Sequence, residues 1–295
     1  MEANLEIDCD TKQIALAPDK HMTVEQVRIL KMSEDSLVED RCRGVLVGLA
    51  AGDRIGGPIR MAVRLAESLI ACDRFDPSDI LNRYLSWWRE GAFDTGPVSE
   101  RVFTLLAAGM PVQKVTAQVH REFNGMTAGC NPAHRSPPLS MFAAIADNDL
   151  ADSAMTEAGL THFDPIAGEI AATVNQLCRS LIRGMGWDEA LRKCGGFGVQ
   201  DGPGSNGGFA PDVLRAAVYF VNQSACFTEV LDRSLEFAGP SNYCPVLVGA
   251  IAGDRWGASA IPPSSLSHVD ILPRVKAAAE ALAADWPWGH SHLAW

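Results

Sequence analysis

The chain has 295 residues, of which 47% are apolar and 21% charged, the proportions of a globular protein with a sizeable core. Its formal net charge is −11. A surface this acidic repels nucleic acid and anionic membranes, so we expect neither as a partner, and an anionic ligand would need a locally basic or amide-lined site.

Helical patterning governs most of the chain. Residues 1–35 are polar with weak periodicity and are predicted to form an extension with one short helix around residues 24–32. From residue 36 the pattern is helical, and within residues 60–73 Met61, Leu65 and Leu69 share one helix face. Further helices are predicted over residues 78–88, 97–108, 112–123, 150–160, 166–182, 211–221 and 274–284.

Strand-like alternation bounded by hairpin turns is nearly absent, which predicts an all-α fold. The organisation expected is one domain over residues 36–285, followed by a tail over residues 286–295. Two loops are unusually rich in glycine and proline, at residues 125–138 and 195–208. Long loops inside a compact helical domain are often functional, although the second could also be a plain surface loop.

A twelve-residue segment occurs twice, near opposite ends of the chain. Residues 45–56 (VLVGLAAGDRIG) and 246–257 (VLVGAIAGDRWG) are identical at nine positions. Glycines spaced by four residues lie along one face of a helix and let another backbone approach closely. The two helices that carry Gly48 and Gly249 are therefore predicted to pack together at the centre of one domain. Packing alone explains most of these glycines, but not the Asp-Arg pairs that follow them.

Targeting and redox signals favour the cytoplasm. The first residues lack the basic segment and apolar run of a secretory signal, and no stretch of about 18 apolar residues could cross a bilayer. None of the eight cysteines forms a C-x-x-C pair. We therefore expect a cytoplasmic protein with reduced, mostly buried thiols; metal binding or disulfides are the alternatives.

Five motifs in chain order resemble the ADP-ribosylglycohydrolase family. They are the run GVLVGLAAGDRIGGP at residues 44–58, the turn Asp94-Thr95-Gly96, the loop at residues 128–139, the Thr161-His162 element before Asp164-Pro165, and the helix at residues 238–257. The resemblance implies a compact orthogonal multi-helix domain. It also implies a cleft for a ribosyl or ADP-ribosyl ligand, carried by a small molecule or by an ADP-ribosylated protein.

The same resemblance shows two departures. The family's Thr-Asp-Asp-Thr run would fall on residues 56–59 (GGPI), and its late Asp-x-Asp-Thr run on residues 240–243 (PSNY). Magnesium prefers carboxylate oxygens, and these eight positions supply none. The expectation is therefore that no binuclear magnesium centre, and no other cofactor, is bound.

Three residues at the motif positions are candidates for catalysis. Asp53 and Asp94 could form an acid and base pair if they face one cleft, and His162 could act as a general base. The competing interpretation is structural, since carboxylates in glycine-bounded turns often cap helices, and histidines are often buried for packing.

Ten further residues are candidates for binding the ligand. Arg135 could neutralise a phosphate, with Arg60 as a second positive group, and Tyr243 could cover the face of a ring. Incidental charges on an exposed loop are the alternative. One cleft is expected to gather residues from five stretches. The full set of binding candidates is Arg60, Thr95, Gly96, Asn131, His134, Arg135, Asp164, Ser241, Asn242 and Tyr243.

The leading functional hypothesis is a glycosidic-bond hydrolase that acts on an ADP-ribosyl or related ribosyl conjugate without two magnesium ions. The alternative is a catalytically inactive nucleotide-binding protein with a sensor or regulatory role, and a third is purely structural use of the scaffold. The aglycone, the oligomeric state and the pathway stay open.

Overall fold

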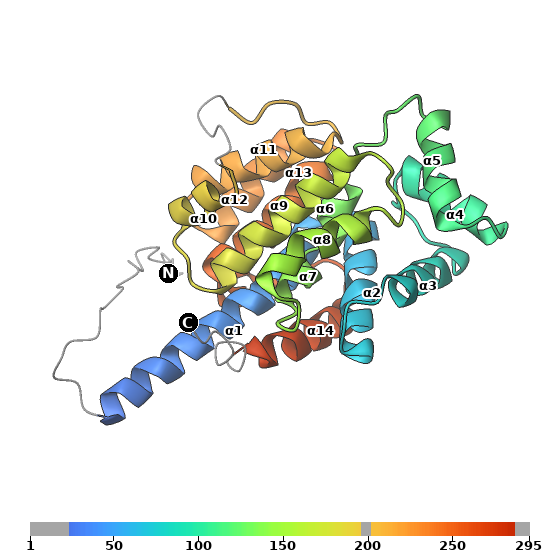
Figure 1. The fold of residues 1–295 in the computed structure, drawn as a ribbon. Coiled ribbons are helices and arrows are strands. Elements are labelled where there is room, and N and C mark those ends of the chain that lie inside the picture. The colour runs from blue at the N-terminus through green and yellow to red at the C-terminus, as the bar shows by residue number, and fades with distance from the viewer. Residues whose placement is uncertain (1–23, 196–201, 287–295) are drawn as a thin grey trace.

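The computed structural model describes residues 24–195 and 202–286, and within them the chain is helical with no strand (Figure 1). An isolated bridge joins Gly129 to Phe209. The predicted all-α class is confirmed. The helices are α1 (Val24–Gly52), α2 (Gly57–Cys72), α3 (Pro77–Arg89), α4 (Pro97–Ala107), α5 (Val112–Glu122), α6 (Asn131–Arg135), α7 (Pro138–Met141), α8 (Asp147–Ala158), α9 (Pro165–Ile182), α10 (Trp187–Lys193), α11 (Ala210–Asn222), α12 (Phe227–Ala238), α13 (Tyr243–Trp256), η1 (Ala258–Ala260), η2 (Pro263–Ser265) and α14 (Leu272–Ala284).

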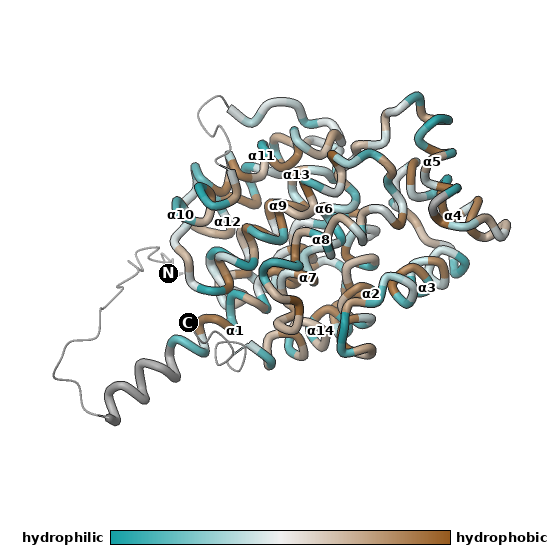
Figure 2. Tube along the Cα trace, viewed as in Figure 1, coloured by the Kyte–Doolittle hydropathy of each residue, from teal (hydrophilic) through white to brown (hydrophobic). Residues whose placement is uncertain are grey.

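The two glycine-rich segments form the central helix pair, as predicted. Helix α1 packs along α13, and α9, α11, α12 and α14 surround them. A Cβ atom added to Gly48 would overlap the carbonyl oxygen of Gly249, and one added to Gly249 would overlap that of Gly48. Both helices are buried along the shared face, and α13 is hydrophobic along most of its length (Figure 2). The repeated segment is therefore a backbone-to-backbone contact at the core of the domain.

Helices α4 and α5 form a separate small unit beside the main bundle, away from α10 and α12 (Figure 1). Their own apolar cluster consists of Val98, Val102, Val115 and Val119. The segments that enter and leave this unit lie next to the bundle. The cavity described below opens between the two parts.

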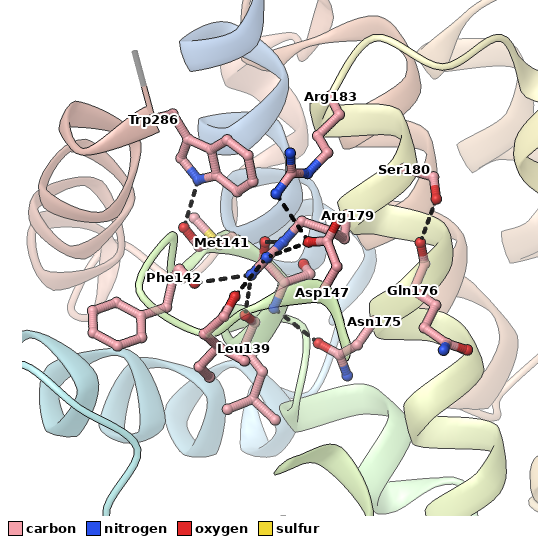
Figure 3. A network of polar contacts seen from close by, with 12 residues as sticks. Leu139, Met141, Phe142, Asp147, Asn175, Gln176, Arg179, Ser180, Arg183 and Trp286 are labelled. Atoms are coloured by element: carbon pink, nitrogen blue, oxygen red, sulfur yellow. Dashed lines mark hydrogen bonds and ion pairs between the residues drawn. The ribbon is translucent and has the colours of Figure 1, made fainter. Parts of the chain in front are cut away.

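A buried arginine fixes the segment that links α7 to α8. The guanidinium of Arg179 in α9 donates to four backbone carbonyls within residues 139–145, at 2.8–3.1 Å, and pairs with Asp147 at 3.0 Å (Figure 3). Trp286 stacks against the same guanidinium and donates its Nε1 hydrogen to the Met141 carbonyl at 2.6 Å. Because Trp286 is buried, the fold continues one residue into the predicted tail.

The other predicted boundary also differs from the helices observed. Helix α1 runs without a break across residue 36, where the domain was expected to begin. The predicted loop at 125–138 contains α6 and the start of α7, and part of the loop at 195–208 lies outside the described residues. Among the helices that are described, none is both long and apolar enough to span a membrane.

Candidate functional site

A cavity of about 360 Å³ lies between the α4–α5 unit and the ends of α6 and α13. Its walls come from segments that are far apart in the chain. The lining residues are Pro58, Asp94, Thr95, Gly96, Pro97, Val98, Ser99, Phe123, Met126, Gly129, Cys130, Asn131, His134, His162, Gly208, Asn242 and Tyr243.

Most of the residues proposed from the sequence do meet at this cavity. The eight that line it are Asp94, Thr95, Gly96, Asn131, His134, His162, Asn242 and Tyr243. They belong to four separated parts of the chain, so their convergence results from the fold and not from proximity in sequence. The five proposed residues that do not line it are Asp53, Arg60, Arg135, Asp164 and Ser241.

Asp53 lies behind the cavity wall as a fully buried acceptor. Its carboxylate accepts hydrogen bonds from the backbone N–H groups of Gly56 at 2.7 Å and Ile59 at 2.8 Å, and from the Asn242 amide at 2.7 Å. The chain needs these bonds because α1 ends at Gly52 and the N–H groups at the start of α2 have no helical partner. The predicted role of Asp53 as one of two facing catalytic carboxylates does not fit this arrangement; Asp53 positions the turn and Asn242.

The Asn242 amide joins Asp53 to Asp94. Its Nδ2 group also donates to the Asp94 carboxylate at 3.2 Å, and its Oδ1 accepts from the Arg54 backbone N–H at 3.0 Å. Asp94 has a positive φ of 53° and lines the cavity. Burial, and then the charge of Asp53, raise the pKa of the Asp94 carboxyl above its usual value. Asp94 is therefore a carboxyl with a raised pKa that faces a ligand space.

This donor set does not fit the binuclear magnesium centre that the family resemblance implies. The Asp53 oxygens already accept three N–H groups. The Asn242 amide donates to both Asp53 and Asp94, so it occupies the position between the two carboxylates that a shared cation would need. A Cβ atom on Gly57 would lie 2.6 Å from the Asp94 carbonyl oxygen, so no side chain can replace that glycine without movement. Within residues 24–195 and 202–286, no three His, Cys, Asp or Glu side chains cluster as metal ligands.

Two histidines of the cavity wall are held neutral. Burial lowers the pKa of His134 to about 4, and its Nε2 atom has no hydrogen-bond partner among the described residues. Burial, and then the charge of Arg135, lower the pKa of His162 well below its usual value. The Nδ1 atom of His162 is 2.7 Å from the Thr161 hydroxyl, which orients the ring. Both imidazoles are therefore uncharged at neutral pH.

Arg135 lies behind the cavity wall, where its predicted contact with a phosphate does not fit. Its fully buried guanidinium pairs with Glu157 at 2.6 Å, stacks on the Tyr84 ring and donates to the Asn131 side-chain oxygen at 2.7 Å. The Tyr84 hydroxyl donates to the same carboxylate at 2.8 Å. The sequence showed a basic residue on a loop, but the five-residue helix α6 turns it into the core. Its effect on the cavity passes through Asn131.

The other three outlying candidates have structural partners too. Arg60 pairs with Asp270 at 2.5 Å, and Asp164 caps α9 by accepting from the Ile166 N–H at 3.0 Å. The Ser241 carbonyl accepts from the Arg54 guanidinium. Their predicted ligand contacts do not fit these positions, because each lies outside the cavity lining.

The remaining predicted residues shape the cavity wall and its mouth. Thr95 donates to Glu100 at 2.9 Å, while Gly96 adopts a φ of 77° before α4 begins. The Asn131 amide donates to the Thr95 carbonyl at 3.2 Å, which ties the α6 side to the α4 side. Tyr243 remains 41% exposed over Gly208. Its ring is available to cover a ligand.

Sequence reasoning missed the apolar part of the lining. Phe123 and Met126 follow α5, and Met126 is 75% exposed. Met126 stands at the start of the glycine- and proline-rich loop, and Phe123 at the end of the helix predicted over residues 112–123. A single exposed methionine in such a loop carries no periodicity, so the pattern could not assign it to a site.

Comparison with known proteins identifies the family to which this all-α chain belongs. The family model described as ADP-ribosylglycohydrolase matches residues 59–290. Because the match covers most of the chain, the chain belongs to the ADP-ribosylglycohydrolase family. The resemblance read from the five motifs is confirmed.

Individual relatives agree. The chain is 21% identical over 276 residues to the ADP-ribosyl-(dinitrogen reductase) glycohydrolase of Rhodospirillum rubrum, covering 79% of this chain and 92% of that protein. It is 21% identical over 295 residues to the ADP-ribosylarginine hydrolase Tri1 of Pseudomonas putida (strain GB-1), covering 82% and 78%. A solved structure described as an ADP-ribosylglycohydrolase-related protein complex superposes with a TM-score of 0.70 at 26% identity, over 84% of this chain and 99% of that chain.

Proposed function

We propose that this chain hydrolyses the glycosidic bond of a ribosyl or ADP-ribosyl conjugate without a binuclear magnesium centre. The observation that carries the proposal is the meeting of one carboxyl with a raised pKa, Asp94, with two neutral imidazoles, His134 and His162, around a ligand-sized cavity. The aglycone is a small molecule or an ADP-ribosylated protein. The activities named for the two curated relatives agree with this substrate class.

The roles follow from the protonation states. Glycoside hydrolysis passes through a transition state with positive charge on the sugar and needs an acid for the leaving group and a base for water. Asp94, with its raised pKa, is the candidate acid, and its ionised form then stabilises the developing charge. His162 is the candidate base because its uncharged ring lines the cavity; its lowered pKa makes it a weak base, which would take a proton from water only as the sugar cation captures that water. Asn131 and Asn242 supply amide groups that can hydrogen-bond ribose hydroxyls.

Metal independence rests on the hydrogen bonds around Asp53. A carboxylate that accepts three N–H groups has little capacity left for a cation, and Asn242 holds the space between Asp53 and Asp94. We therefore expect catalysis to persist in a chelator. The amide supplies the link between two acidic groups that a divalent ion would otherwise provide.

One observation favours a second candidate, a catalytically inactive ribosyl-binding protein. Asp53 is saturated and lies behind the wall, so Asp94 is the only carboxylate on the cavity surface among the described residues. The arrangement gives no support to hydrolysis by Asp53 and Asp94 as a facing pair, so our proposal assigns the second role to His162. A sensor would keep the cavity and need no such replacement.

The deciding experiment incubates the protein with ribosyl and ADP-ribosyl conjugates of amino acids and nucleobases, with and without EDTA, and measures release of the aglycone. We expect release that EDTA does not reduce and that Asp94→Asn lowers by about 10²-fold or more. Asp152→Asn is the matched control, because Asp152 is exposed on α8 and the change is chemically the same. Binding without release would favour the sensor, and release abolished by EDTA would contradict metal independence.

A further inference from the structure

The cavity lining contains no lysine or arginine among the described residues. Its only formal charge belongs to Asp94, and both of its histidines are neutral. A diphosphate in proteins is usually held by arginine or lysine side chains or by clustered backbone N–H groups. The protein as a whole carries a net charge of −11, so its long-range field opposes an anion as well.

The nearby arginines are engaged elsewhere. Arg135 is buried against Glu157, Arg60 pairs with Asp270, and Arg54 donates to the Ser241 carbonyl. Turning Arg135 into the cavity would leave Glu157 as an unpaired buried charge, which is strongly unfavourable. None of these three arginines is therefore placed to bind a phosphate in the cavity.

Helix ends replace these side chains only in part. Helices α4 and α13 both begin at the cavity, and each helix N-terminus carries a partial positive charge of roughly half a unit. Pro97 in the first turn of α4 and Pro245 in that of α13 each remove one N–H donor, which leaves the neutral N–H groups of Val98 and Ser99 as the donors of α4 on the cavity wall. The Asp94 carboxylate beside them offsets the remaining dipole field when it is ionised.

What the cavity does offer suits an uncharged sugar and ring. Val98, Phe123 and Met126 supply apolar surface, and the Tyr243 ring supplies an aromatic face. Ser99, Asn131 and Asn242 are neutral polar groups on the wall, able to bond hydroxyls. His134 adds an uncharged imidazole to the wall, and its buried Nε2 atom has no hydrogen-bond partner among the described residues.

We propose that the cavity binds the uncharged ribosyl end of its ligand, the sugar with its attached ring, while any 5′-phosphate points out past Met126 at the rim. Phosphate-free N-ribosyl compounds are then ligands as good as their phosphorylated counterparts. This deepens the proposed function and rests on it. Recognition here depends on shape and neutral hydrogen bonds, not on phosphate charge.

The test is calorimetry on a panel of nucleosides, each paired with its own 5′-phosphate, together with ADP-ribose. Within each pair that binds, we expect dissociation constants within about threefold of each other. We also expect neither member to lose affinity from about 50 to about 500 mM NaCl, because no ion pair is formed. A preference of about tenfold or more for the phosphorylated member, weakened by salt, would overturn the proposal.

The panel separates this inference from the proposed function. If ADP-ribose binds and no nucleoside does, the inference is wrong and the proposed function stands. If no ribosyl compound binds, the proposed function is wrong, and the inference falls with it.

A gain of charge at the rim gives an independent readout. In Met126→Lys the new ammonium would meet a phosphate that leaves the cavity there, so the phosphorylated member of each pair should gain about two- to fivefold in affinity, in a salt-dependent way. Met155→Lys is the matched control, since Met155 is 40% exposed on α8 and outside the lining. An unchanged ratio in Met126→Lys would contradict the outward path of the phosphate.

Discussion

The two copies of the Gly-Asp-Arg segment place the same aspartate in opposite environments. Asp53 follows the last residue of α1 and accepts three N–H groups beside the cavity. Asp254 lies inside α13, fully buried, and neither of its oxygens makes a hydrogen bond of normal geometry to a described residue. The neighbouring Cys178 thiol and Arg41 lower the pKa of its carboxyl, but burial outweighs both and raises it well above its usual value.

The difference follows from where each helix ends. Helix α1 stops one residue before Asp53, and the free N–H groups of the following turn become its partners. Helix α13 continues to Trp256, so the N–H groups around Asp254 are used inside the helix. A repeated sequence therefore yields one carboxylate that accepts three N–H groups and one buried carboxyl whose pKa is raised. The motif alone does not define a site.

The glycine contact that both copies share should give the largest effect. Gly48→Ala and Gly249→Ala each place a Cβ against the partner's backbone, which cannot shift as a flexible side chain would. We expect each to lower the free energy of unfolding by about 3 kcal/mol or more. Urea denaturation measures this, with Gly186→Ala as the control because a Cβ there meets nothing within 4 Å. Equal stability of Gly48→Ala and Gly186→Ala would contradict the close packing.

Replacing each aspartate with asparagine should change the unfolding free energy differently in the two copies of the segment. Asp53→Asn turns one acceptor into a donor and leaves an N–H group unpaired, so we expect a loss of about 1.5–3 kcal/mol in unfolding free energy. Asp254→Asn keeps the shape and removes a buried acid, so stability at neutral pH should be unchanged or higher. The same loss in both variants would show that the environments are equivalent.

The pH dependence of Asp254→Asn sharpens this further. In the native protein Asp254 holds its proton more tightly than in the unfolded chain, so stability falls as pH rises from the ordinary carboxyl range toward the raised pKa. The slope is about 1.4 kcal/mol per pH unit for one such group. The stability advantage of Asp254→Asn over the wild type should therefore grow between acidic and neutral pH. Parallel stability curves would show that Asp254 is not buried as a neutral acid.

The sequence was sufficient for the fold and for part of the site. Glycines at a spacing of four predicted the central α1–α13 pair, because that pattern has one good structural solution. Helix α12 was missed, although its apolar positions are regular, and α10 was too short to give a pattern. Motif position indicated Asp94 and Asn242, which line the cavity, whereas Arg135 and Asp53 lie behind its wall, because burial and hydrogen-bond partners depend on distant segments.

The smallest effect is expected from a substitution of Asn242, whose amide gives Asp53 one of the hydrogen bonds that Asp254 lacks. In Asn242→Asp a third carboxylate replaces the amide that now donates to Asp53 and Asp94. Three carboxylates repel one another unless a cation lies between them, and oxygen ligands suit magnesium. The variant should therefore lose stability in EDTA and regain it with magnesium.

The expected gain is about 1.4 kcal/mol in unfolding free energy when magnesium exceeds its dissociation constant tenfold. The wild type should not respond, because its amide holds that space. Asn124→Asp is the matched control: Asn124 is exposed, has a φ of 52° that aspartate also tolerates, and gives the same change in charge. An equal response of Asn242→Asp and Asn124→Asp would mean that the ion acts on surface charge. A wild-type response abolished by Asp94→Asn would show that Asp94 already binds a cation, and metal independence would then be wrong.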